Sequence, residues 1–82
     1  MVQFVDVHSP RGTSLTFSFS GEASFDNAAS SVPWTAYVST EEGQVALRGV
    51  AVDVRDAWLT KSVAMQAVRD ALDVRFGTVP QL

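Results

Sequence analysis

The residues nearest the N-terminus that could take part in chemistry are a carboxylate and an imidazole. Asp6 and His8 are two positions apart, so both side chains would lie on the same face of a β-strand. This spacing could orient the imidazole for proton transfer or provide two metal ligands. Two ligands do not complete a metal site, however, and His8 is the only histidine and borders a predicted turn. We therefore interpret the pair as structural.

Further carboxylates lie near the middle of the chain. Asp53 and Asp56 flank Arg55 and could bind a cation or exchange protons if their environments differed. Asp56 is equally well placed to cap a helix, and Asp53 to lie on an exposed strand, and we favour that interpretation. Glu41 and Glu42 are most simply the charged tip of a hairpin.

No other catalytic or cofactor-binding pattern is visible in the sequence. The serines lie outside any Gly-x-Ser-x-Gly motif, and the five glycines are too widely spaced to form a phosphate-binding loop. The chain has no cysteine, which excludes disulfides and thiolate metal sites. We predict that the protein is not an enzyme and holds no cofactor or metal ion.

Size and charge narrow the class of protein further. The 82 residues suffice for a single domain, residues 1–82, with a modest core. Its net charge is −3 and its six cationic residues are scattered, which disfavours binding to a phosphate backbone. No apolar run approaches the roughly 20 residues that cross a bilayer, and the N-terminal residues do not resemble a secretory leader. We predict a small, acidic, cytoplasmic protein.

Four segments have the residue pattern of β-strands. In the first, apolar residues occupy both parities, which predicts that both faces are at least partly covered, as in a strand away from the sheet edge. The next two alternate, with Leu15, Phe17 and Phe19 on one face of the second and Trp34, Ala36 and Val38 on one face of the third. A hairpin connection that ends at Gly43 precedes the fourth. The segments are residues 2–7, 13–20, 34–40 and 44–55.

The fourth segment changes the parity of its apolar residues partway along. Val45 and Leu47 share one parity, whereas Val50 and Val52 share the other. A β-bulge at Gly49 would explain the change by inserting one residue. A turn at the same place is the alternative, and we favour the bulge because no second turn residue accompanies the glycine.

An amphipathic helix is predicted to follow and to complete an α+β fold of the form β-β-β-β-α. It begins at Asp56 or, as we favour, with Thr60 as its N-cap, and it ends at Gly77 with Pro80 shortly beyond. At 100° per residue, one set of apolar residues forms the core-facing stripe: Ala64, Met65, Val68, Ala71, Leu72 and Phe76.

Some large or apolar residues exceed what such a small core needs. Val63, Ala67 and Val74 widen the apolar arc of the helix to roughly 220°, against about 100° or more for a surface helix. Either these side chains are tolerated at the surface or a partner covers them, most simply a second copy in a homodimer.

Aromatic residues are the other interface candidates. Trp34 and Trp58 lie at element boundaries, where a ring either fills the end of the core or protrudes as an anchor. Tyr37 shares its face with Thr35 and Ser39 and is our first choice for an exposed contact.

These features lead to one main hypothesis and two alternatives. The main hypothesis is a non-catalytic protein-interaction module, homodimeric or bound to a host complex. The first alternative is an inhibitor encoded by a phage or mobile element and directed against a host complex, including nucleic-acid-guided defence. The second is a weak nucleic-acid-binding domain that uses a sheet face, with Tyr37 for stacking and Arg48 or Arg55 for phosphate contacts.

Overall fold

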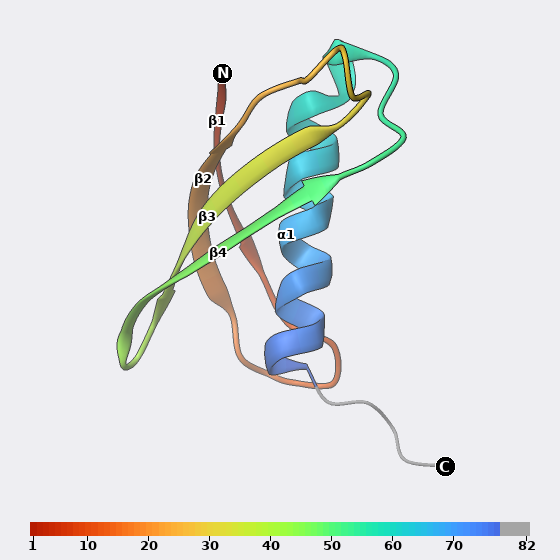
Figure 1. Ribbon diagram of the computed structural model, residues 1–82. Helices are drawn as coiled ribbons and strands as arrows, with labels where there is room; N and C mark the ends of the chain where they lie inside the picture. The colour runs from red at the N-terminus through yellow and green to blue at the C-terminus, as the bar shows by residue number, and fades with distance from the viewer. Residues whose placement is uncertain (78–82) are drawn as a thin grey trace.

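The computed structural model of the chain describes residues 1–77, and Pro80 therefore lies outside the described residues. Within these residues, four antiparallel strands in the order β1-β2-β3-β4 form one sheet, and a single helix packs against it (Figure 1). This arrangement confirms the predicted β-β-β-β-α fold. The elements are β1 (Val2–His8), β2 (Phe17–Ala23), β3 (Val32–Thr40), β4 (Gly43–Ala51), the 3₁₀ turn η1 (Ala57–Leu59) and α1 (Thr60–Phe76).

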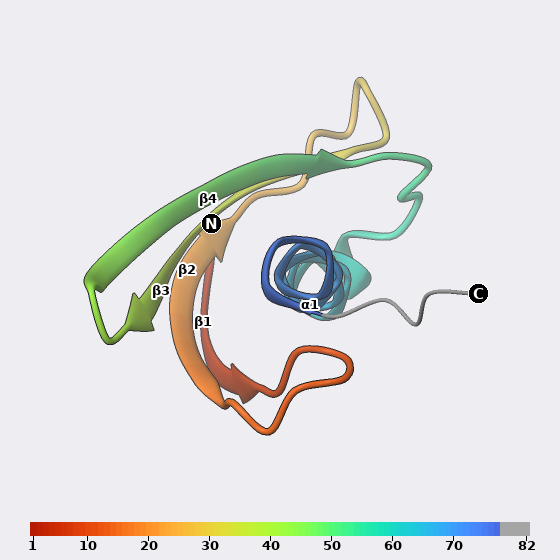
Figure 2. The same cartoon turned by 90° about the horizontal axis from the view of Figure 1, so that it is seen from below.

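The sheet is strongly curved, and α1 lies inside the curve (Figure 2). The core fills the space between the concave face of the sheet and the helix, and each fully buried large apolar side chain there contributes about 1.5–3 kcal/mol. The predicted faces of β3 and α1 are confirmed, since the inward residues of both elements are buried. The core residues are Phe4, Phe19, Ala23, Val32, Trp34, Ala36, Val38, Val54, Ala64, Val68 and Leu72.

Two aromatic residues on the concave face lie over glycines of the neighbouring strand. Phe4 is the cross-strand partner of Gly21, and Trp34 is the partner of Gly49. A Cβ atom at Gly21 would come within 2.7 Å of the Phe4 ring, and one at Gly49 within 2.7 Å of the Trp34 indole. These glycines therefore provide space for a ring that covers them.

The role of Gly49 corrects our interpretation of the fourth strand. The pairing of β3 with β4 runs without a break from Val32↔Ala51 to Thr40↔Gly43, so β4 has neither a bulge nor a turn at Gly49. The inward parity of Val45 and Leu47 continues through Gly49, where the Trp34 ring replaces the missing side chain. Gly43 adopts φ +118°, as predicted for the hairpin connection.

The first two strands also differ from their predicted environments. β1 lies at the edge of the sheet, and Val5 and Val7 are exposed on the convex face, at 76% and 57%. The prediction of a strand covered on both faces was wrong because apolar residues at an edge can face solvent. β2 begins at Phe17 and continues to Ala23, which leaves Leu15 in the preceding loop and half exposed.

The helix is entered through a capped 3₁₀ turn. Asp56 is the N-cap of η1, and its Oδ1 atom accepts a hydrogen bond from Trp58 N at 2.9 Å. Thr60 is the first residue of α1 and not its N-cap as we favoured, because its hydroxyl donates to Ala57 O at 2.7 Å. Gly77 ends the helix as predicted, and its N–H donates to Asp73 O at 3.0 Å.

Candidate interaction surface

The rest of the described chain leaves the convex face of the sheet uncovered. The helix occupies the concave side, and the loops pass around the ends of the sheet (Figure 2). The outward side chains form three cross-strand rows over β1 to β4. The rows are Gln3-Glu22-Thr35-Arg48, Val5-Ser20-Tyr37-Ala46 and Val7-Ser18-Ser39-Gln44.

Tyr37 lies in the middle of this face and is 46% exposed. Its cross-strand partners, Ser20 and Ala46, have small side chains, so the ring stands above its neighbours. Beside it lies a shallow hollow of about 330 Å³, which reaches across Ser20 and Gly21 to Val5. An aromatic ring next to a small depression can anchor a partner's side chain.

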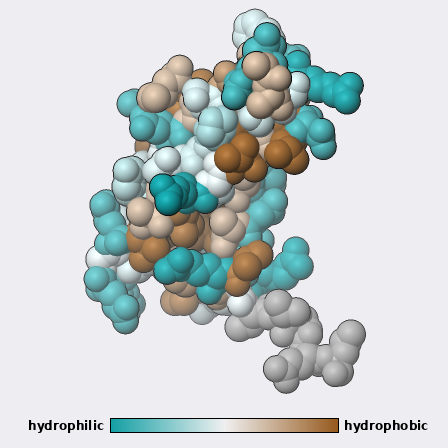
Figure 3. Space-filling model, viewed as in Figure 1, coloured by the Kyte–Doolittle hydropathy of each residue, from teal (hydrophilic) through white to brown (hydrophobic). Residues whose placement is uncertain are grey.

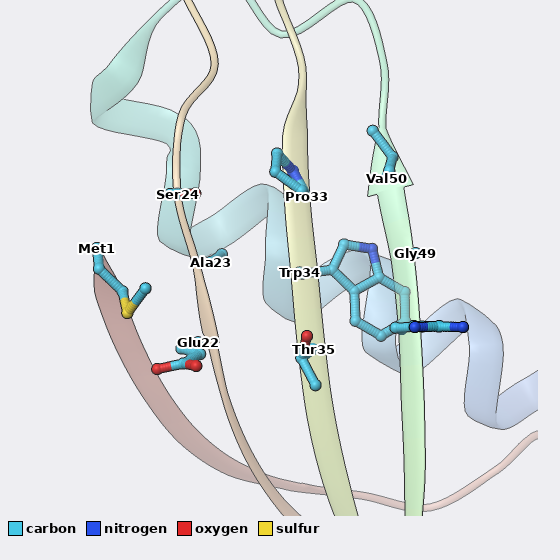
Figure 4. A pocket seen from close by; sticks show the side chains of 10 residues that line it. Met1, Glu22, Ala23, Ser24, Pro33, Trp34, Thr35, Gly49 and Val50 are labelled. Carbon is cyan, nitrogen blue, oxygen red and sulfur yellow. The ribbon is translucent and has the colours of Figure 1, made fainter.

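A second hollow, of about 500 Å³, adjoins the first at Glu22 (Figure 4). Thr35 lies between Glu22 and Arg48 in the cross-strand row, so the hollow has a carboxylate on one side and a guanidinium on the other. Met1 and Val50 contribute apolar walls. The surface thus combines apolar walls, hydroxyl groups and one charge of each sign.

The two predicted tryptophan candidates lie in opposite environments. Trp34 is buried on the concave face, and Figure 4 shows its indole reaching across toward Gly49. Trp34 thus belongs to the core and borders the larger hollow only from within the sheet. Trp58 is 93% exposed, and it lies on η1 and is not part of the convex face of the sheet.

The three helix candidates are also divided by the structure. Val63 and Ala67 are half-buried and pack against the core, so the chain itself covers much of the wide apolar arc. Val74 is 87% exposed. The helix therefore offers one isolated valine, which weakens the argument for a partner on this element.

Asp6 and His8 lie on the same face of β1, and both side chains turn inward to the helix. His8 Nε2 lies 2.8 Å from Asp73 Oδ1, which also accepts a hydrogen bond from Arg11 N at 2.9 Å. Asp6 forms an ion pair with Arg69. Each residue of the predicted pair thus has its own partner on α1.

These contacts change the ionisation of both carboxyl groups. A hydrogen bond from the backbone of Val7, followed by the Arg69 side chain, lowers the pKa of Asp6 below its ordinary value of 3.8. The hydrogen bonds with His8 and with the Arg11 backbone lower the pKa of Asp73. Both shifts arise because charged or polar donors favour the ionised carboxylate, and they accord with a structural role for this edge of the molecule.

The remaining chemical candidates are not assembled into a site. Asp53 adopts φ +60° in the connection after β4, a conformation that aspartate tolerates better than most residues, while Asp56 caps η1. Glu41 and Glu42 form the tip of the β3–β4 hairpin, where both are exposed. Among residues 1–77, no group of three or more His, Cys, Asp and Glu side chains could hold a metal ion. No helix within the same residues is long and apolar enough to cross a membrane.

The exposure of Tyr37 was predicted from the sequence and is confirmed, whereas the hollows beside it were not predicted. The hollows depend on which residues become cross-strand neighbours, and no pairing that would place Arg48 across from Thr35 was predicted from the sequence. The alternating hydroxyl residues of β2 and β3, such as Ser18, Ser20 and Thr35, were the sequence feature that could have indicated this surface. Comparison of the chain with protein families, with curated proteins and with solved structures finds no match.

Proposed function

We propose that the protein is a non-catalytic interaction module that binds a partner protein on the convex face of its sheet. The observation that carries this proposal is the exposed Tyr37 ring between small residues, with a hollow beside it. Tyrosine provides a large contact area and loses little side-chain entropy on binding. We also propose that the protein acts in the cytoplasm.

Charge on the convex face favours a protein over a nucleic acid as the partner. In the three cross-strand rows, Arg48 is the cation and Glu22 the carboxylate, so the face offers a phosphate backbone little net attraction. Both charges could pair with a protein that presents the complementary groups at its rim. Inhibition of a host complex by a phage-encoded or mobile-element protein stays a prediction and would use this same face.

The test is affinity capture with the wild-type chain and two variants. We expect a defined protein to be captured from a lysate of the source organism by the wild type and lost with Tyr37→Ser. Val74→Ser is the matched control, because Val74 is exposed on the helix and should leave capture unchanged. Both substitutions should alter the free energy of unfolding by less than about 1 kcal/mol.

Capture that is equal for all three proteins would contradict the use of this face. A mobility shift with single-stranded RNA or DNA that weakens with salt would favour the nucleic-acid alternative instead. Folding of each variant is checked by circular dichroism, so that loss of capture is not confused with unfolding.

A further inference from the structure

The two edges of the sheet differ in the side chains that they turn inward. Strands at an edge carry unpaired backbone N–H and C=O groups, and inward-pointing charges are one way to prevent a foreign strand from adding there. β1 has this protection, since Asp6 and His8 point inward and are held by Arg69 and Asp73. A strand added beside β1 would place its own inward side chains next to these charges.

β4 has no such protection. Its inward residues are Val45, Leu47, Gly49 and Ala51, and its sequence contains neither proline nor lysine. Figure 3, which looks onto the β4 side of the molecule, shows hydrophobic side chains near the end of β4 and between the β3–β4 hairpin and the lower part of α1. A hollow of about 640 Å³ also opens beside Val45, between the hairpin and Phe76 at the end of the helix.

We propose that β4 pairs antiparallel with β4 of a second copy of this chain, with the two-fold axis at Ala46. The two four-stranded sheets would become one sheet of eight strands, with both helices on the same side. A two-fold axis perpendicular to the sheet keeps the inward face of each strand inward, so a residue on the axis meets its own counterpart.

Side-chain complementarity selects Ala46 as the centre of the pairing. On the concave face, Val45 lies opposite Leu47 of the second copy, which joins two half-buried apolar residues. On the convex face, Arg48 lies opposite Gln44 of the second copy and diagonal to its Glu42, within reach of a long side chain. An axis at Arg48 would instead bring two guanidinium groups together.

The difference between the edges also limits the size of the assembly. After β4 has paired with its counterpart, both ends of the long sheet are β1 strands, which carry the inward charges. The same protection that blocks β1 in the monomer therefore closes the dimer and prevents growth into a fibre. This dimer uses β4, whereas the homodimer considered from the sequence would have used the apolar arc of the helix. It does not depend on binding at the convex face.

Single cysteines test the register, because the native chain has none. Ala46→Cys places two sulfur atoms beside the two-fold axis, where opposed Cβ atoms are about 4.5–5.5 Å apart. We expect a mild oxidant to convert most of this variant into a disulfide-linked dimer. Gln44→Cys and Arg48→Cys should each stay largely unlinked alone and form a mixed dimer when combined.

Absence of a linked Ala46→Cys dimer would overturn the proposed register, as would equally efficient linking of Gln44→Cys with itself. The second measurement is molar mass by size-exclusion chromatography with light scattering. The wild type should be a dimer at high micromolar concentration, and a monomer there would overturn the pairing itself.

Val45→Lys should convert that dimer to a monomer, because it gives β4 the inward charge that β1 already has. Val45 is half-buried but lies outside the set of residues packed against the core, so the fold should tolerate the change. Val7→Lys on the convex face of β1 is the matched control and should stay dimeric. A dimeric Val45→Lys protein would overturn the proposed edge. The convex-face capture is scored separately, so its failure leaves these results unaffected.

Discussion

The strands β1 and β4 occupy equivalent positions at opposite edges of one sheet, yet they turn different kinds of side chain toward the helix. β1 turns an aspartate and a histidine toward the helix, and both are engaged by helix residues. β4 turns aliphatic residues and a glycine inward. The comparison shows that the protection of an edge depends on its inward side chains and on the helix that satisfies them, while exposed valines are present on the convex faces of both strands.

The largest expected effect concerns Gly21 and Gly49, the two glycines that lie beneath the rings of Phe4 and Trp34. Gly21→Ala would press a Cβ atom against Thr35 O and place it 2.9 Å from the Cα atom of Ala36, and both are backbone atoms of β3 that cannot move aside. We expect a loss of more than about 3 kcal/mol in the free energy of unfolding, or failure to fold. For Gly49→Ala, the three atoms nearest to the added Cβ all belong to the Trp34 ring, the first at 2.7 Å, and the variant should lose about 1–3 kcal/mol.

Urea denaturation followed by circular dichroism measures both glycine variants. Gly43→Ala is the control, because no atom lies within 4 Å of its added Cβ and only its positive φ is strained. We expect that variant to lose about 1 kcal/mol. If Gly21→Ala were no worse than Gly43→Ala, the tight contact between Gly21 and the backbone of β3 would be refuted.

A second experiment removes the difference between the edges. The double substitution Asp6→Val with His8→Val gives β1 the apolar inward pattern of β4, so both edges should accept another strand. We expect light scattering to detect assemblies larger than those of the wild type, growing with concentration. Asp6→Asn with His8→Gln retains polar inward groups and should lower stability without adding assembly. Equal assembly of the two double variants would show that inward polarity does not protect β1.

The smallest expected effect is the pH dependence of the β1 edge. The folded-state pKa values of Asp6 and Asp73 are lowered from 3.8, so both groups stabilise the fold above that value. Their contribution should fade as the pH falls through the lowered folded-state values. As the pH falls, the melting temperature of the wild type should therefore decline more steeply than that of the double variant Asp6→Asn with Asp73→Asn. Parallel curves of melting temperature against pH would contradict the conclusion that the contacts of Asp6 and Asp73 stabilise the fold.

Periodicity alone was enough for the class of fold and the buried faces of two elements. The alternation of Trp34, Ala36 and Val38 and the spacing of Ala64, Val68 and Leu72 follow directly from the geometry of strands and helices. Those patterns depend on neighbours along the chain, which a single sequence contains.

The predictions that were wrong depended on neighbours across the sheet, which the sequence does not show. β1 resembled an interior strand because its apolar residues lie on both faces, and strand order is not encoded in that pattern. Gly49 resembled a bulge because the ring that covers it comes from another strand. The placement of Asp6 and His8 on one face was predicted, whereas their partners on the helix were not.

The rings of Phe4 and Trp34 over their glycines have a consequence for how this sequence can evolve. At positions 4 and 21, and again at 34 and 49, a larger residue beneath the ring collides with it, and a smaller residue in place of the ring opens a hole. A substitution at either position of a pair, made alone, should therefore lower the stability of the fold. In homologous chains the two positions of each pair should therefore vary together, with bulk exchanged between strands so that their combined volume is maintained.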